Sequence, residues 1–219
     1  MKRMKKSRWA LALLSVGIMA LAAGCGGDDD PVQVTEDPPV EPRTPEALLD
    51  AFQAGYEARD SDQYLALLDT DFQFILREET AARFPDLGPA LDFAEEERIH
   101  QRMFSGEGVT DPGGDPRPGV REVVFYQFRA QDGWADSDDA DNFPNAIWAP
   151  FELDLIIDCG QEFSTYKATG QAKIYVREYS RMNGGEEVTF FKLAGMVDLT
   201  QSDKGVERTP WGLIKAFYR

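Results

Sequence analysis

Cysteine and histidine are scarce in this sequence, which has 2 cysteines and 1 histidine among 219 residues. Zinc sites and iron–sulfur clusters need several such ligands, so we expect no site of either kind. The sequence also has no G-x-S-x-G, glycine-rich phosphate loop or H-E-x-x-H motif, which removes the usual indications of hydrolases and nucleotide-binding proteins. We therefore assign no catalytic residue, no metal and no cofactor from the sequence.

Basic residues are also in short supply, with 23 Lys and Arg against 39 Asp and Glu, a formal net charge of −16 and a pI near 4.4. Five of the 23 lie in residues 1–8, so removal of residues 1–24 would leave 18 basic residues against 39 acidic ones, a net charge of −21. This charge repels phosphate backbones, and there is no compensating basic patch. We expect no nucleic-acid partner.

Long hydrophobic runs are limited to residues 9–23, which are uncharged but short for a membrane span. With the basic residues 1–8 before it, this run is typical of a secretory signal. It ends in Leu21-Ala22-Ala23-Gly24-Cys25, which resembles the bacterial lipobox, although Ala22 replaces the commoner leucine three positions before the cysteine. The resemblance implies that residues 1–24 are a lipoprotein signal peptide and that Cys25 receives the lipid.

A lipid on Cys25 implies attachment to a membrane of the bacterial cell envelope. Gly26 is not the aspartate of the inner-membrane retention signal, so an outer-membrane location is favoured. The alternatives are a secreted protein cleaved near Ala23 and, less favoured because the run is short, an uncleaved membrane anchor. If Cys25 is acylated, Cys159 has no disulfide partner, and we expect it to remain a free thiol.

Residues 25–44 form an acidic, proline-rich segment without aromatic residues, which predicts an extended tether. Calcium binding at Asp28-Asp29-Asp30 is the alternative to a solvated charge run. Residues 45–219 show no internal repeat and no second break, and they predict one domain with a real core.

The domain begins with a helix signal at Thr44-Pro45-Glu46, where a hydroxyl cap precedes a proline at the first helical position. We expect a short helix after Ser61 or Asp62, a strand over residues 71–76 and a third helix that includes Leu87 and runs to about residue 104. Alternation predicts strands over residues 120–130, 151–158, 171–180 and 187–200, with a last strand within 210–218. Asn183-Gly184-Gly185 predicts the hairpin turn between two of them.

Helices at the start and strands at the end predict an α+β fold, with helices packed on one face of a curved antiparallel sheet. Residues 44–76, TPEALLDAFQAGYEARDSDQYLALLDTDFQFIL, and the ending PWGLIKAFYR resemble the NTF2-like superfamily, and within it small bacterial lipoproteins of unassigned activity. The resemblance follows the element order over residues 44–219. It implies about three N-terminal helices packed into a cone of bent strands.

NTF2-like cones often hold a pocket between helices and sheet, and the family includes ketosteroid isomerase. The resemblance makes Phe52, Tyr56, Phe72, Phe74 and Leu76 candidates to line such a pocket. In an alignment on the Arg59-Asp60-Ser61-Asp62 turn, Phe52 replaces the isomerase's tyrosine donor and Leu76 replaces its aspartate base. The isomerase mechanism is therefore not implied for this chain.

Other polar groups have a functional and a plainer interpretation. His100 with Glu96 one turn earlier could begin an acid–imidazole pair, whereas a surface histidine is the favoured interpretation. The acid pairs Asp69 with Asp71 and Asp154 with Asp158 are read as solvated faces or helix caps rather than as paired catalytic carboxylates.

The segment 136–142 has clustered oxygen ligands, but it lacks the glycine and glutamate of an EF-hand, so an acidic loop is favoured over a calcium site. The aromatic residues Trp134, Phe143, Trp148 and Phe151 flank it. They could form a partner-binding patch, although core packing is the default for aromatic residues at strand ends.

Three functional hypotheses follow. We favour a non-catalytic envelope lipoprotein that binds a small apolar ligand or a protein partner, ahead of an assembly factor that uses the outer face of the sheet. The third is a cofactor-free NTF2-like enzyme, an isomerase or cyclase, with an unrecognised pocket. Polar groups that face a cavity would favour the enzyme, and apolar cavity walls would favour the ligand-binding protein. An exposed apolar patch on the surface would favour the partner-binding module.

Overall fold

The computed structural model describes residues 41–138, 140–160, 165–200 and 209–219. These residues belong to the second of two compact units, Pro38–Arg219. The expected signal peptide, Cys25 and most of the expected tether lie outside the described residues. Within them, no helix is long and apolar enough to cross a membrane.

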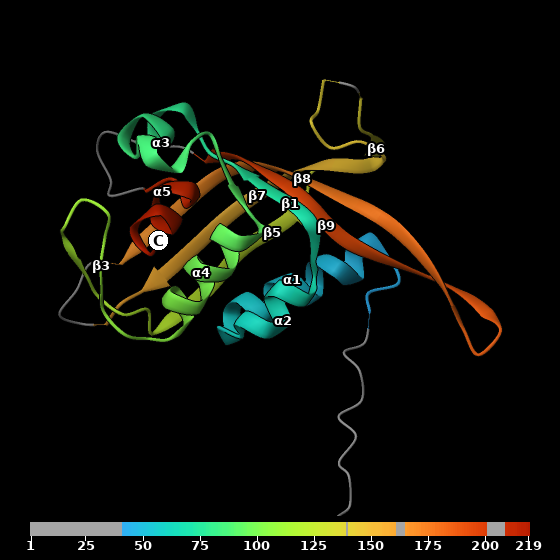
Figure 1. The fold of residues 1–219 in the computed structure, drawn as a ribbon, viewed down its shortest axis with the longest axis horizontal. Coiled ribbons are helices and arrows are strands. Elements are labelled where there is room, and N and C mark those ends of the chain that lie inside the picture. The colour runs from blue at the N-terminus through green and yellow to red at the C-terminus, as the bar shows by residue number, and fades with distance from the viewer. Residues whose placement is uncertain (1–40, 139, 161–164, 201–208) are drawn as a thin grey trace, which may run out of the picture. The chain divides into compact units, whose positions relative to one another are not determined.

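The helices and strands follow one another as in Figure 1. They are α1 (Pro45–Ala58), α2 (Ser61–Ala66), β1 (Leu68–Ile75), α3 (Glu78–Arg83), the 3₁₀ turn η1 (Pro85–Leu87), β2 (Ala90–Asp92), α4 (Phe93–Phe104), β3 (Val109–Thr110), β4 (Pro116–Arg117), β5 (Glu122–Ala130), β6 (Ala135–Asp136), β7 (Ala146–Asp158), β8 (Tyr166–Asn183), β9 (Glu186–Thr200) and α5 (Trp211–Phe217).

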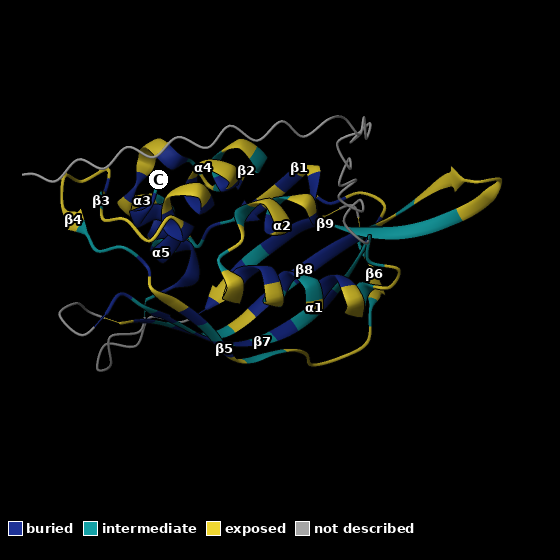
Figure 2. Ribbon diagram, turned by 90° about the horizontal axis from the view of Figure 1, so that it is seen from below, coloured by how far each residue is buried: buried dark blue, intermediate teal, exposed yellow. Residues whose placement is uncertain are grey.

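The main sheet has the strand order β2-β1-β9-β8-β7-β5, with β6 paired to β7. Helices α1, α2, α4 and α5 lie against one face of this curved sheet (Figures 1 and 2). The α+β fold class is therefore confirmed. One pair departs from the expected antiparallel sheet, because β1 and β9 run parallel.

The helix signal at the start of the domain is confirmed. Thr44 Oγ1 accepts a hydrogen bond from the backbone N–H of Ala47 at 3.1 Å, and α1 ends at Ala58, followed by the C-cap residue Arg59, whose φ of 56° is left-handed. The helix α2 is capped one residue earlier than expected, since Asp60 accepts from the N–H of Gln63 at 2.9 Å.

Two expected elements are wrong in part or in full. The helix α4 begins at Phe93 rather than near Leu87, because residues 90–92 pair with β1 as β2 and Asp92 then caps the helix by accepting from Glu95 N at 2.9 Å. The expected last strand is the helix α5. Six of its seven residues are buried, so the one-sided pattern of an ordinary surface helix is missing from its sequence.

The strands β8 and β9 extend beyond the rest of the sheet as a two-stranded hairpin (Figures 1 and 2). The expected turn is confirmed, with Gly184 and Gly185 at φ values of 62° and 95° that favour glycine. The last pair between β7 and β8 joins Ala146 and Arg177, and β1 pairs with β9 no further out than Leu193. We call residues 178–183 and 186–191 the arm.

Candidate functional site

The residues expected to line a pocket instead lie within the hydrophobic core. Each of the five is at most 6% exposed, and they are Phe52, Tyr56, Phe72, Phe74 and Leu76. The ring of Trp211, itself fully buried, packs among them, with centroid distances of 6.2, 5.8 and 5.4 Å to Phe52, Tyr56 and Phe74. The side chain of Trp211, from α5, therefore occupies the space between these residues of the helices and the sheet.

His100 is fully buried, so the surface interpretation of this residue is wrong. Its Nδ1 lies 2.8 Å from the carbonyl oxygen of Glu96 and 3.1 Å from Glu96 Oε2, and its Nε2 lies 3.1 Å from the Tyr56 hydroxyl. Because both neighbours of Nδ1 are acceptors, we assign the proton to Nδ1, and Nε2 accepts from Tyr56. The i, i+4 acid–imidazole pair is present, but inside the protein.

Glu96 has two further partners that the sequence did not suggest. Lys215 Nζ lies 2.8 Å from both carboxylate oxygens, and the Tyr64 hydroxyl donates to Oε2 at 2.9 Å. All three side chains are fully buried. Lys215 follows Glu96 by 119 positions, so no local motif could have revealed the pair.

The charge state of this cluster follows from its contacts. Burial alone would raise the pKa of Glu96, but Lys215 and His100 outweigh it and lower the pKa to about 2. Burial lowers the pKa of His100, against the opposing effect of Glu96. Burial also lowers the pKa of Lys215, against the opposing effect of Glu96. Lys215 and Glu96 lie 2.8 Å apart as an ion pair, and the lowered pKa of His100 favours its neutral imidazole.

The hydrogen bonds of the cluster form a continuous chain that ends at Glu96. Trp211 Nε1 donates to the Tyr56 hydroxyl at 3.1 Å, Tyr56 donates to His100, and His100 donates to Glu96. Lys215 also lies 4.0 Å from the centroid of the Phe74 ring, a cation–π contact. The hydrogen-bonding groups of these side chains therefore satisfy one another inside the protein.

Asp198 is a second buried acid and acts as a helix cap. Its Oδ2 accepts from Gly212 N at 2.8 Å, and its Oδ1 accepts from Thr200 N at 2.9 Å, while Thr200 Oγ1 accepts from Trp211 N at 3.0 Å. Burial raises the pKa of Asp198, opposed by the bonds from Thr200 and Gly212. Both side chains fix the start of α5 on the sheet.

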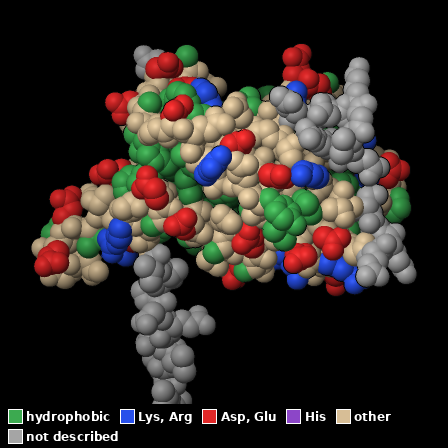
Figure 3. Space-filling model, turned by 180° about the vertical axis from the view of Figure 1, so that it is seen from behind, with side chains coloured by type: hydrophobic (Ala, Val, Ile, Leu, Met, Phe, Trp, Pro, Cys, Tyr) green, Lys and Arg blue, Asp and Glu red, His purple; other side chains and the backbone are tan. Residues whose placement is uncertain are grey.

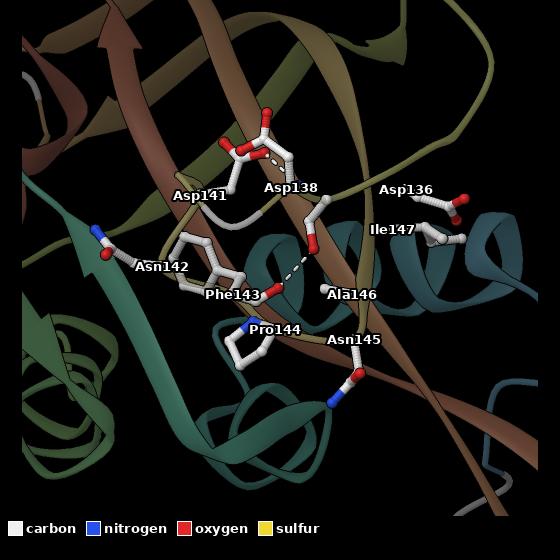
Figure 4. A pocket seen from close by; sticks show the side chains of 10 residues that line it. Asp136, Asp138, Asp141, Asn142, Phe143, Pro144, Asn145, Ala146 and Ile147 are labelled. Atoms are coloured by element: carbon white, nitrogen blue, oxygen red, sulfur yellow. Dashed lines mark hydrogen bonds between the residues drawn. The ribbon is translucent and has the colours of Figure 1, made fainter.

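Residues 136–138 and 141–147 line a surface pocket of about 560 Å³. Figure 4 shows Asp138 and Asp141 beside each other, with the backbone N–H of Asp138 donating to Asp141 at 3.3 Å, and Asp136 apart from both. Asp141 is already used by Tyr175, whose hydroxyl donates to it at 2.7 Å. In the described part of the chain, no three His, Cys, Asp or Glu residues are grouped as metal ligands.

The four aromatic residues near this loop do not form one patch. Phe143 is 4% exposed and its ring lies 4.3 Å from that of Tyr175, in a small cluster that also includes Trp148. Phe151 and Trp134 pack on the main core instead, 6.1 Å apart.

Three of the four acids in these pairs are ion-paired with basic side chains, and the fourth, Asp158, accepts from the backbone N–H of Gly160 at 3.0 Å. Asp69 and Asp71 both bind Arg177, and Asp69 is only 4% exposed, so it is not part of a solvated face. Asp154 lies 3.1 Å from Lys167. The alternation of β8 predicts which side of the sheet Arg177 faces, but not its distant partners.

Cys159 is a free, buried thiol that is 1% exposed, and burial raises its pKa. The Tyr218 hydroxyl lies 3.7 Å from its sulfur. Among the described residues, which do not include Cys25, Cys159 has no disulfide partner.

No family model and no curated protein matches this sequence. Among solved structures, the chain is similar to an NTF2-like superfamily protein from Salmonella enterica, at 9% identity and a TM-score of 0.42, covering 74% of this chain and 92% of that one. It is also similar to an NTF2-like protein from Cytophaga hutchinsonii (12%, 0.36, 68% and 89%) and to a protein of unknown function from Mycobacterium tuberculosis (8%, 0.41, 74% and 70%). Identities of this size concern the fold and not the activity.

Proposed function

We propose that this chain is a lipid-anchored protein of the bacterial cell envelope that binds a protein partner on its surface and has no catalytic activity. The observation that carries the proposal is the filled interior, in which Trp211 occupies the centre of the core. Ligand pockets are concave and largely formed before the ligand arrives. A core filled by its own side chains favours a surface function.

The buried polar cluster supports the absence of catalysis. A general base must reach the proton that it abstracts, directly or through one water. His100 and Glu96 are fully buried and bonded to Tyr56, Tyr64 and Lys215. Their geometry is that of a structural network in a low-dielectric interior.

The anchoring part of the proposal rests on the Leu21-Ala22-Ala23-Gly24-Cys25 site and the basic, then apolar, residues before it. We expect Cys25→Ser to release the protein from the membrane fraction, and mass spectrometry of the parent to show a lipid on Cys25. An unmodified Cys25 in membrane-bound protein would contradict anchoring without affecting the proposed surface binding.

A ligand screen tests the filled interior. We expect fatty acids and steroids to leave the melting temperature of the parent unchanged, because Trp211 and the core side chains around it occupy the space between helices and sheet in the described residues. Trp211→Ala should melt at a lower temperature and be stabilised again by an apolar ligand that fills the new cavity. Trp211→Phe is the matched variant, which keeps most of the ring and should respond weakly.

Clear stabilisation of the parent by such a ligand would overturn the proposal in favour of a ligand-binding protein. Turnover of a bound compound that is lost in His100→Gln, with the fold retained, would favour an enzyme.

A further inference from the structure

Among the described residues, one edge of the arm is covered and the other is open. On the β9 side, Phe191 N donates to the carbonyl of Pro42 at 3.0 Å, and Arg43 donates to the carbonyl of Thr189 at 3.0 Å. On the β8 side, no described residue makes a backbone hydrogen bond to residues 178–183 from outside the hairpin. An isolated two-stranded hairpin is marginally stable in water, so this open edge favours a further strand.

The register shows which backbone groups lie on the open edge. The backbone N–H of Phe191 and the backbone carbonyl of Thr189 point away from β8. Two residues that lie opposite each other in an antiparallel pair either both hydrogen-bond to each other through their backbone groups, or both direct these groups away from the pair. Glu178 and Ser180, which lie opposite Phe191 and Thr189, therefore direct their backbone N–H and C=O groups away from β9, to the open edge of β8. Met182 follows by alternation. Pro150 of β7 supports this assignment. Its carbonyl accepts from Gln131 N and so points away from β8, which means that Lys173 opposite it directs its backbone groups toward β9. By alternation along β8, the even-numbered residues then direct their backbone groups to the other edge.

The two faces of the arm differ in charge. Tyr179 and Phe190 stack at 5.6 Å on one face, where the guanidinium of Arg181 also lies 5.8 Å from the Phe190 ring. The opposite face has Glu178 and Met182, and Met182 is 68% exposed. Figure 3 shows acidic, basic and hydrophobic side chains along this projection.

We propose that the open edge of β8 pairs antiparallel with the same edge of a second copy, with Ser180 opposite Ser180. This inference names the partner for the surface function proposed above and rests on it. The pairing places Tyr179 opposite Arg181 and Glu178 opposite Met182, with roughly six backbone hydrogen bonds. It joins two hairpins into one four-stranded sheet.

Charge selects this register among its neighbours. A two-fold axis at Tyr179 would place Arg177 of one copy opposite Arg181 of the other. An axis at Arg181 would place the two Arg181 side chains opposite each other, and an axis at Glu178 would do so for the two Glu178 carboxylates. Like charges directly opposite one another destabilise a sheet. The centre at Ser180 brings no like charges together and still pairs Glu178, Ser180 and Met182 on each copy.

Analytical ultracentrifugation of the full chain in detergent tests the association. We expect a concentration-dependent dimer that Ser180→Pro weakens about 25-fold, because each copy loses one outward N–H and each hydrogen bond contributes roughly a fivefold factor. Glu187→Pro is the matched control, since it places proline on the other edge of the same hairpin. It should leave dimerisation within about twofold of the parent.

Crosslinking tests the register. Ser180→Cys places two thiols across the two-fold axis, where Cα atoms of a bonded pair lie about 5.5 Å apart. A short bifunctional maleimide should give a covalent dimer with Ser180→Cys, but not with the parent or with Glu187→Cys.

The pairing is overturned if the parent stays monomeric up to about 100 times the concentration used for the ligand screen. It is also overturned if Ser180→Cys and Glu187→Cys crosslink equally, or if Ser180→Pro and Glu187→Pro weaken the dimer equally. Such a result leaves the filled interior untouched and directs the surface function to another protein. Ligand binding by the parent would instead overturn the proposed function.

Discussion

Removing one member of the buried ion pair should destabilise the fold far more than removing both. In Lys215→Met, Glu96 would remain fully buried with Tyr64 and His100 as donors but without a counter-charge. Breaking a buried pair on one side typically costs about 3–5 kcal/mol, whereas replacing both charges with groups of similar volume is often nearly neutral. We therefore expect Lys215→Met to lose about 3–5 kcal/mol of the free energy of unfolding.

A double-mutant cycle measures this difference. Glu96→Gln keeps an acceptor for Tyr64, and Glu96→Gln combined with Lys215→Met should be at least about 2 kcal/mol more stable than the sum of the single losses predicts. Urea denaturation followed by tryptophan fluorescence reports on the core, since Trp211 is fully buried.

The exposed pair Arg129 and Glu152, whose side chains are 72% and 41% accessible, provides the control, with a coupling of about 1 kcal/mol or less. Additive losses at Glu96 and Lys215, or a coupling no larger than in the control, would refute the reasoning that the two charges depend on each other.

Three further predictions concern buried groups. Stability should fall as the pH drops below about 6.5, because unfolded His100 takes up a proton that the folded residue resists, and His100→Gln should flatten this part of the urea-midpoint curve. Cys159 should react with iodoacetamide only after denaturation, because it is buried and its pKa is raised; fast labelling of the native chain would contradict this. Gly195→Ala should displace the Phe143 ring, which a Cβ would overlap, and cost about 1–3 kcal/mol in the same urea assay, with no change expected for Gly133→Ala, where no atom lies nearby.

The sequence was sufficient to predict features that depend only on residues close together in the chain, such as a helix cap or a hairpin turn. The hydroxyl of Thr44 and the ring of Pro45 act within one helical turn, and Gly184 and Gly185 act within one hairpin turn. The helix α5 could not be recognised in this way, because its burial on nearly all sides removes the polar face that reveals an amphipathic helix.

The candidate site shows the same limit more sharply. Glu96 and His100 lie in an acidic and basic stretch that is typical of a solvated helix face. Their burial depends on Lys215 and on Tyr56 and Tyr64, all supplied by other helices. A buried charge becomes recognisable only when its counter-charge is known, and here the two are 119 positions apart in the chain.

The network also has a consequence for where function can lie. It joins α1, α2, α4 and α5 through Tyr56, Tyr64, Glu96 and Lys215, and Asp198 fixes the start of α5 from β9. Moving α5 to open the core would separate an ammonium from a carboxylate in a low-dielectric interior, which costs several kcal/mol. The helix that carries Trp211 is therefore held closed by charge as well as by apolar packing. Binding energy is better used at the arm, where backbone groups of β8 already face outward and no buried contact has to be broken first.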